Sequence, residues 1–273
     1  RQVLGTFFTD DMVGTGIKLL NSDISGLTLV GMAFDNLQED GDIGIGTNHD
    51  LFLGYNGEEV TDRNLYGVAA IGSYDPVSFQ LWYAALDSVA QLYVADVTVG
   101  ANLGDVDLSL QAQAAGSSMW ADNAILAGVS EALDDATFWA AELGAKAFGF
   151  DASVGYVQFD SDEISLISFE DQGSFIDAGE DLLNYTAFAG DNKYWFVTAG
   201  YTFADKVRVG ADYVAGEGSS NVLTRDVDRY EAVARVDYKY SKKLNFKAWY
   251  SYIDRDNTLK DNEHLRFEAR YNF

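Results

Sequence analysis

A period-two alternation of apolar and polar residues is the feature that most constrains this chain. In residues 262–273 one face carries Leu265, Phe267 and Tyr271, while the other carries Arg266 and Arg270. Because successive side chains of a strand point to opposite faces, this period predicts a β-strand with one apolar and one charged face. The apolar face would meet a second sheet in a soluble sandwich. In a membrane barrel it would meet lipid, and the charged face would meet water.

The same alternation recurs along the chain, and the charged side chains of residues 206–216, 227–240 and 244–255 fall on one face. Thirteen strands are predicted, at residues 12–21, 27–35, 65–73, 77–86, 89–100, 105–115, 137–147, 150–159, 192–203, 206–216, 227–240, 244–255 and 262–273. Repetition with constant polarity indicates a single all-β architecture, and we treat residues 1–273 as one domain.

The gaps between these strands alternate in length. Short gaps lie near residues 22–26, 74–76, 101–104, 148–150, 204–205 and 241–243, and most of the gaps between them are much longer, as at 36–64, 116–136 and 160–191. Bacterial outer-membrane barrels have short periplasmic turns and long external loops. The pattern therefore predicts a transmembrane antiparallel β-barrel of the general-porin type, with extracellular long loops and a periplasmic C-terminus.

An odd number of strands conflicts with this architecture, because a bacterial single-chain barrel with both ends in the periplasm has an even number. The first predicted strand already runs inward from the outside. We therefore expect N-terminal strands that are missing from this sequence, or one further strand near residues 1–8.

Composition excludes several functions. The net charge of −25 disfavours nucleic acid as a partner and favours cations or neutral solutes. No apolar run is long enough for a transmembrane helix, but a mean hydropathy of −0.10 is compatible with a membrane barrel. Cysteine is absent, and neither His49 nor His264 lies in a metal or nucleophile motif, so we expect no enzymatic activity.

Several blocks resemble the Campylobacter-type (epsilon-proteobacterial) major outer membrane porin family. They are RQVLGTFFTDDMVGTGIK at 1–18, GLTLVGMAFD at 26–35, ISFEDQGSFIDAGE at 167–180 and WFVTAGYTF at 195–203. The resemblance implies a homotrimeric porin of about 18 strands, of which the thirteen predicted here would be the sixth to the last. It also implies that residues 3–11 form an inward-folded constriction loop.

The resemblance further implies a calcium ion at the constriction. The acidic residues that match the family blocks, and are therefore candidate ligands, are Asp10, Asp11, Asp35, Glu170 and Asp171. Clusters such as Asp10–Asp11 could supply some of the oxygens that calcium requires, but the chain has no EF-hand spacing.

Charge selectivity in a pore comes from charged side chains that face each other across water. Carboxylates dominate residues 1–191, whereas basic residues gather in the last strands. The candidate pore-lining and constriction residues are Asp10, Asp11, Arg208, Arg229, Arg235, Lys239, Lys247, Arg266 and Arg270. Alternatively, each of these residues only solvates the lumen and pairs with a neighbour. The summed negative charge predicts a preference for cations.

Aromatic residues near strand ends predict two further features. Trp139, Tyr240, Tyr252 and Tyr271 lie in the apolar phase and would form girdles at the membrane interfaces. Tyr271 and Phe273 at the C-terminus also resemble the signal that barrel-assembly machinery reads.

The sequence thus predicts a porin of the bacterial outer membrane that passes ions and small hydrophilic solutes and prefers cations. Its expected partners are outer-membrane lipid and lipopolysaccharide, two further copies of the chain, and the solutes themselves, without nucleic acid. The alternative is a non-conducting barrel that acts as a surface structural protein or adhesin through long acidic loops. A soluble β-rich binding protein is a third possibility.

Overall fold

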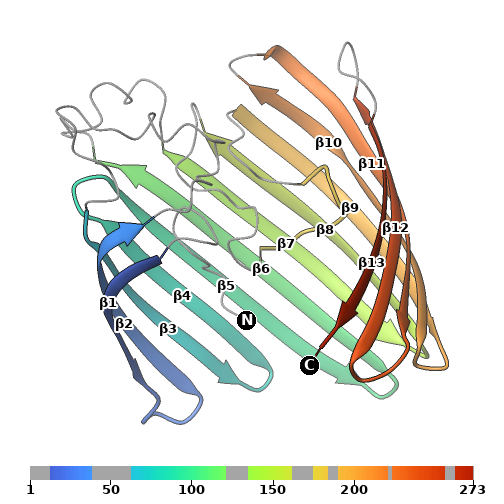
Figure 1. Cartoon of the computed structure of the whole chain (residues 1–273), viewed down its shortest axis with the longest axis horizontal. Helices are drawn as coiled ribbons and strands as arrows, with labels where there is room; N and C mark the ends of the chain where they lie inside the picture. Colours follow the sequence, from blue (N-terminus) through green and yellow to red (C-terminus); the bar gives the residue numbers. More distant parts are fainter. Residues whose placement is uncertain are drawn as a thin grey trace.

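The protein forms one antiparallel sheet in which every strand pairs with its neighbours in the sequence. The computed structural model describes residues 13–38, 63–120, 135–161, 175–183, 190–220, 223–255 and 262–272. The strands are β1 (Val13–Asn21), β2 (Leu27–Gln38), β3 (Leu65–Tyr74), β4 (Val77–Leu86), β5 (Ala90–Leu103), β6 (Val106–Met119), β7 (Ala136–Ala147), β8 (Phe150–Ser161), β9 (Gly190–Phe203), β10 (Val207–Ser220), β11 (Leu223–Lys239), β12 (Leu244–Arg255) and β13 (Asn262–Tyr271). Figure 1 shows the sheet curved into a trough.

All thirteen predicted strands are present, and the predicted all-β antiparallel fold is confirmed. The largest differences are at strand ends. The sequence predicts that β6 ends at residue 115, but the strand continues to Met119. Gly116 allows this continuation because it lies opposite Tyr93 of β5, and a Cβ at Gly116 would lie 2.3 Å from the Tyr93 hydroxyl. A glycine followed by two serines resembles a loop in sequence, although here the glycine makes room for a cross-strand ring.

Short turns connect β1 to β2, β3 to β4, β5 to β6, β7 to β8, β9 to β10 and β11 to β12, and they gather at the lower end of the trough in Figure 1. The sheet does not close within the described residues, where β1 and β13 each pair with a single neighbour. In the same residues the structure contains no helix with the length and apolar character needed to span a membrane.

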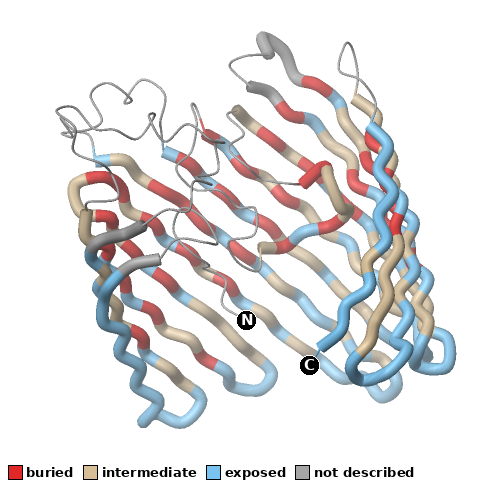
Figure 2. The backbone as a smooth tube through the Cα atoms, viewed as in Figure 1, coloured by how far each residue is buried: buried red, intermediate tan, exposed pale blue. Residues whose placement is uncertain are grey.

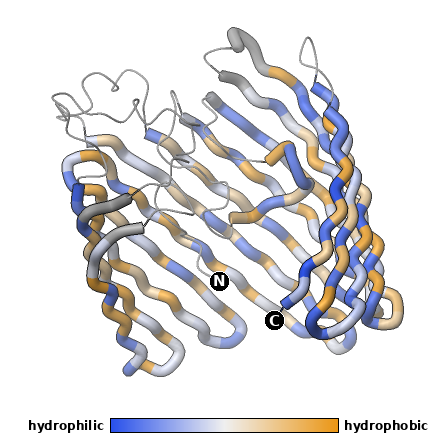
Figure 3. Tube along the Cα trace, viewed as in Figure 1, coloured by the Kyte–Doolittle hydropathy of each residue, from blue (hydrophilic) through white to orange (hydrophobic). Residues whose placement is uncertain are grey.

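The outer face of the trough carries large apolar side chains that are exposed. Leu143 on β7 is 52% exposed, Val209 on β10 is 46% exposed and Leu265 on β13 is 74% exposed. These residues lie in the apolar phase that the sequence assigned to lipid. Figures 2 and 3 show the alternation of burial and hydropathy along the strands.

Aromatic side chains form two rows on the outer face. One row contains Trp139–Tyr156, Trp195–Tyr213, Tyr213–Tyr230 and Tyr230–Tyr252, with ring centroids 4.9–6.1 Å apart within each pair. The other contains Phe150–Tyr201, Tyr238–Tyr240, Tyr238–Phe246 and Phe246–Phe267. Along β9, six residues separate Trp195 from Tyr201, which corresponds to about 20 Å of strand. Two aromatic rows that border an exposed apolar band are typical of membrane barrels.

The inner face differs from the uniformly polar wall that the alternation suggests. Phe138, Val157, Phe196, Val214 and Ile253 are almost completely buried there and belong to one hydrophobic cluster. They are covered because residues 175–183 lie inside the trough, as Figures 1 and 2 show. We call residues 175–183 the inner segment.

Candidate channel-lining site

The inner segment packs on the inner wall through its own apolar residues. Ile176, Ala178, Leu182 and Leu183 are buried and join the cluster formed by the strands. The ring of Phe175 meets the ring of Phe138 on β7 edge to face, with centroids 4.8 Å apart. The inner segment is therefore an integral part of the inner surface.

Glu231 on β11 anchors the middle of the inner segment. Its carboxylate is fully buried. One oxygen accepts hydrogen bonds from the backbone N–H groups of Glu180 (3.0 Å) and Asp181 (3.1 Å), and the other accepts one from Leu182 (3.0 Å). The hydroxyl of Ser251 on β12 donates a fourth, at 2.5 Å. Burying a carboxylate costs a great deal of free energy unless such donors surround it.

Gly179 makes this close approach possible. It has φ of +83°, a conformation that favours glycine, and a Cβ there would lie 2.2 Å from a Glu231 carboxylate oxygen. Any side chain at this position would push the inner segment away from Glu231.

Ion pairs hold the inner segment against β11 and β12. The guanidinium of Arg235 pairs with Asp212 and, at 2.9 Å, with Glu180, and it donates a hydrogen bond to the backbone carbonyl of Gly179. Lys247 also pairs with Glu180, at 3.2 Å. Glu180 therefore meets two cations of the wall.

Two further contacts connect the inner segment to strands far apart in the sheet. The backbone N–H of Ile176 donates to the side-chain oxygen of Gln113 on β6 at 2.6 Å. On the other side of the trough, His264 on β13 lies 3.3 Å from Asp181, one of the residues that Glu231 holds, and its ring stands against Trp249. Contacts with β6, β7, β11, β12 and β13 thus place the inner segment across the trough.

A polar cavity of about 380 Å³ lies between the inner segment and the wall. It is lined by Glu142, Ser153, Asp177, Ala178, Gly179, Glu180, Thr198, Arg208, Asp212, Arg235 and Lys247. Asp177 exposes its side chain to this space. The pKa of the Asp177 carboxyl is raised to about 7, chiefly because the surrounding protein disfavours the charged form and also because Glu231 and Glu180 are negative.

Arg208 crosses the wall below this cavity. Its guanidinium reaches from β10 over β9 to Asp151 on β8, at 2.5 Å, and lies 3.8 Å from Asp237 on β11. Gly200 on β9 leaves the path open, since a Cβ there would lie 2.4 Å from the guanidinium. One arginine thereby connects its own strand to β8 and β11.

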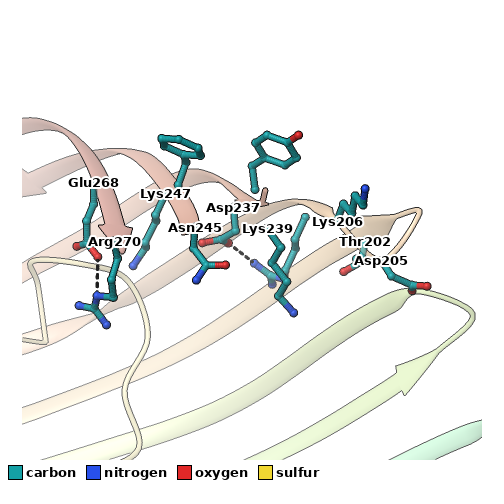
Figure 4. Close-up of a pocket in the computed structure, with 12 residues that line it drawn as sticks. Thr202, Asp205, Lys206, Asp237, Lys239, Asn245, Lys247, Glu268 and Arg270 are labelled. Atoms are coloured by element: carbon teal, nitrogen blue, oxygen red, sulfur yellow. Dashed lines mark ion pairs between the residues drawn. The ribbon is translucent and has the colours of Figure 1, made fainter. Parts of the chain in front are cut away.

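A second cavity, of about 400 Å³, lies toward the turns. Figure 4 shows Lys239, Asn245, Lys247 and Arg270 pointing from the wall into it. Arg270 pairs with Glu268 at 3.3 Å. Basic side chains outnumber acidic ones in this part of the wall.

Six of the predicted pore-lining residues belong to the inner wall near these two cavities. Arg208, Arg235 and Lys247 line the cavity beside the inner segment, and Lys239 and Arg270 line the second. Arg266, which is 3.6 Å from Glu268, lies on the same wall.

The remaining candidates lie apart or outside the described residues. Arg229 is on β11 in the inward phase of Glu231 and hydrogen-bonds the hydroxyl of buried Tyr194, apart from the two charged cavities. Asp35 is exposed on β2 in the phase of Leu29, opposite to that of buried Val30. Asp10, Asp11, Glu170, Asp171 and Phe273 lie outside the described residues, and so do residues 3–11, the predicted constriction loop. Tyr271 ends β13 and is exposed.

Sequence reasoning did not identify Glu231, Asp212 or the inner segment as functional. Glu231 and Asp212 lie in the inward phase of their strands, but their partners are about 50 and 20 residues away in sequence. The local sequence offers one sign of the inner segment, a glycine at 179 with Asp177 and Glu180 close on either side.

The comparisons with known proteins address identity. The family model described as Campylobacter major outer membrane protein matches residues 1–273. The chain belongs to this family. The predicted family is thereby confirmed, and membership in a porin-like outer-membrane family agrees with the expectation that the protein is not an enzyme. No curated protein sequence matches the chain.

Solved outer-membrane porins have the same fold as this family member. Acinetobacter baumannii OccAB4 matches with a TM-score of 0.72 and 13% identity, over 95% of this chain and 65% of that one. Pseudomonas aeruginosa OccK9 matches with a TM-score of 0.70 and 17% identity, over 95% and 66%. A BenF-like porin from Pseudomonas fluorescens matches with a TM-score of 0.68 and 18% identity, over 95% and 68%. The chain spans about two thirds of the length of these proteins.

Proposed function

We propose that this family member forms a water-filled outer-membrane channel for passive diffusion of ions and small hydrophilic solutes, with a preference for cations. The observation that carries the proposal is the charged cavity between the inner segment and the wall, on the opposite side of the sheet from the exposed apolar band. A wall with charges on its inner face and apolar residues on its outer face suits a channel.

The preference for cations follows from the carboxylates. Asp177 and Glu142 line the cavity, and the chain has a net charge of −25. The basic residues of the same wall are largely engaged by carboxylates, as Arg235 and Arg208 illustrate. The unbalanced field is therefore negative and attracts cations.

Recordings from planar lipid bilayers test this function. We expect discrete conductance steps, and a reversal potential in a KCl gradient that shows potassium to be more permeant than chloride. A barrel that inserts without conductance steps would favour the alternative structural or adhesive role, and a chloride preference would refute the selectivity alone.

We further propose that the chain assembles as a homotrimer, that its outer face contacts lipid and lipopolysaccharide, that its long loops are extracellular, and that calcium binds at the constriction. The aromatic rows support membrane contact. Within the described part of the chain no cluster of three acidic or histidine side chains could hold a metal, so a calcium site would depend on residues such as Asp10, Asp11 and Glu170. Calcium titration calorimetry tests the site, and the mass of the detergent-solubilised complex tests the trimer.

A further inference from the structure

We propose that Glu231 is the positioning residue that holds the inner segment across the channel, so that this one buried carboxylate sets the width of the channel. This inference rests on the proposed channel function. It concerns a residue that the sequence placed on the lumen wall without a role.

The geometry around Glu231 is specific. Three consecutive backbone N–H groups, those of Glu180, Asp181 and Leu182, converge on its two oxygens. Leu182 is buried, so its N–H has no access to bulk water if the carboxylate is removed. An unpaired buried N–H carries a large penalty, and the inner segment must then move toward water to recover hydrogen bonds.

The acceptor has to be a carboxylate. An ionised carboxylate accepts several hydrogen bonds and donates none, whereas an amide turns one oxygen acceptor into a donor. Glu231→Gln would therefore place an N–H₂ group against backbone N–H groups, even though its shape is unchanged. Ser251 strengthens the arrangement, because its hydroxyl donates to the same carboxylate from β12.

The other attachments of the inner segment are of a different kind. Arg235 and Lys247 contact the Glu180 side chain, and the Arg235–Glu180 pair is itself largely buried. These ion pairs hold one side chain of the inner segment, whereas Glu231 holds three of its consecutive backbone N–H groups. Loss of Glu231 therefore releases the middle of the inner segment while the ion pairs and the end contact at Gln113 remain.

The absence of cysteine from the chain provides a direct test. Ala178 is 6% exposed in the inner segment, and Ala178→Cys places a small thiol there. We would measure its rate of reaction with a water-soluble thiol reagent, in detergent-solubilised barrel, alone and combined with Glu231→Gln or Glu231→Ala. We expect the rate to rise at least about tenfold in both combinations. Losing a hydrogen bond to a charged group shifts the equilibrium between the held and released segment by about that factor or more.

Glu268→Gln is the matched control. It removes one carboxylate from the same wall, where Glu268 pairs with Arg266 and Arg270 rather than with the inner segment. The labelling rate of Ala178→Cys should stay unchanged in this background. Heat-modifiable migration on gels shows that each variant has formed the barrel, and Glu231→Gln serves if Glu231→Ala does not fold.

Single-channel conductance completes the test. It should rise in Glu231→Gln and Glu231→Ala and not in Glu268→Gln. Unchanged labelling in the Glu231 variants would overturn the anchoring role, and faster labelling with unchanged conductance would overturn the control of width. A wild-type protein without any conductance would refute the proposed function instead, and the labelling rates would still decide whether Glu231 anchors the inner segment.

Discussion

At the scale of single residues, the backbone conformation of Gly179 determines how closely the inner segment approaches Glu231. Gly104 has a similar positive φ of +74°, but nothing lies within 4 Å of the position of its Cβ. Substitutions at these two glycines therefore distinguish the effect of backbone strain, which both share, from the effect of a steric clash, which only Gly179 has.

We expect Gly179→Val to displace the inner segment and Gly104→Val to leave it in place. Both substitutions carry the strain of a left-handed backbone, about 1–2 kcal/mol, and only the first brings a side chain against Glu231. The thiol-labelling rate of Ala178→Cys measures the displacement. Equal rates in the two variants would show that the clash at Gly179 is relieved without movement.

Asp177 predicts a pH dependence of ion preference. Its pKa is raised to about 7, first because the surrounding protein disfavours the charged form and then because Glu231 and Glu180 are negative. As pH rises from 6 to 8, Asp177 should ionise and add a negative charge to the cavity. The reversal potential in a KCl gradient should accordingly shift toward stronger cation preference.

His264 contacts Asp181 of the same inner segment, so its contribution has to be separated from that of Asp177. The measurement therefore uses a His264→Gln background. The pH shift should persist in that background and disappear when Asp177→Asn is added. Persistence with Asp177→Asn would assign the titration to another group.

At the scale of elements, Arg208 shows how one side chain connects strands that do not pair with each other. Its contact with Asp151 spans β9, and Gly200 provides the space. A hydrogen-bonded ion pair of this kind, partly shielded from water, stabilises more than an exposed pair.

We expect Arg208→Gln to lower the free energy of unfolding by about 1–2 kcal/mol, and Lys239→Gln, on the same wall, to change it by less than about 0.5 kcal/mol. Urea unfolding in lipid vesicles measures both. The two variants each remove one positive charge and should raise the preference for cations to a similar extent. Equal stability would show that Asp151 finds another donor.

At the scale of the whole molecule, the two faces of the sheet meet different surroundings. Leu143 and Glu142 are neighbours on β7, yet Leu143 is exposed on the outer apolar face and Glu142 lines the inner cavity. A charge in hydrocarbon is costly, whereas a charge in a water-filled lumen is not.

We expect Leu143→Lys to cost about 2–4 kcal/mol in folding into lipid vesicles, the range for lysine near the midplane of a barrel. Glu142→Lys should fold nearly as well as the wild type and weaken the preference for cations. Equal penalties for both substitutions would mean that the outer face does not contact lipid.

The sequence by itself determined the strands, their pairing with neighbours and the polarity of the two faces. These properties depend on local period and on turn residues, so that β4 and β12 are predicted with the same bounds that the structure shows. The same local information predicted that Arg208, Arg235 and Lys247 share one charged face, which is the inner face of the trough.

Only the tertiary structure decided what lies inside the trough. The sequence treats residues 160–191 as an external loop, whereas residues 175–183 pack on the inner wall and bury Ile253 and Val214. The contact between Glu231 and the inner segment joins residues about 50 positions apart. The period-two alternation within a strand does not predict such a contact. The contact depends on how the curved sheet brings distant strands to the same interior.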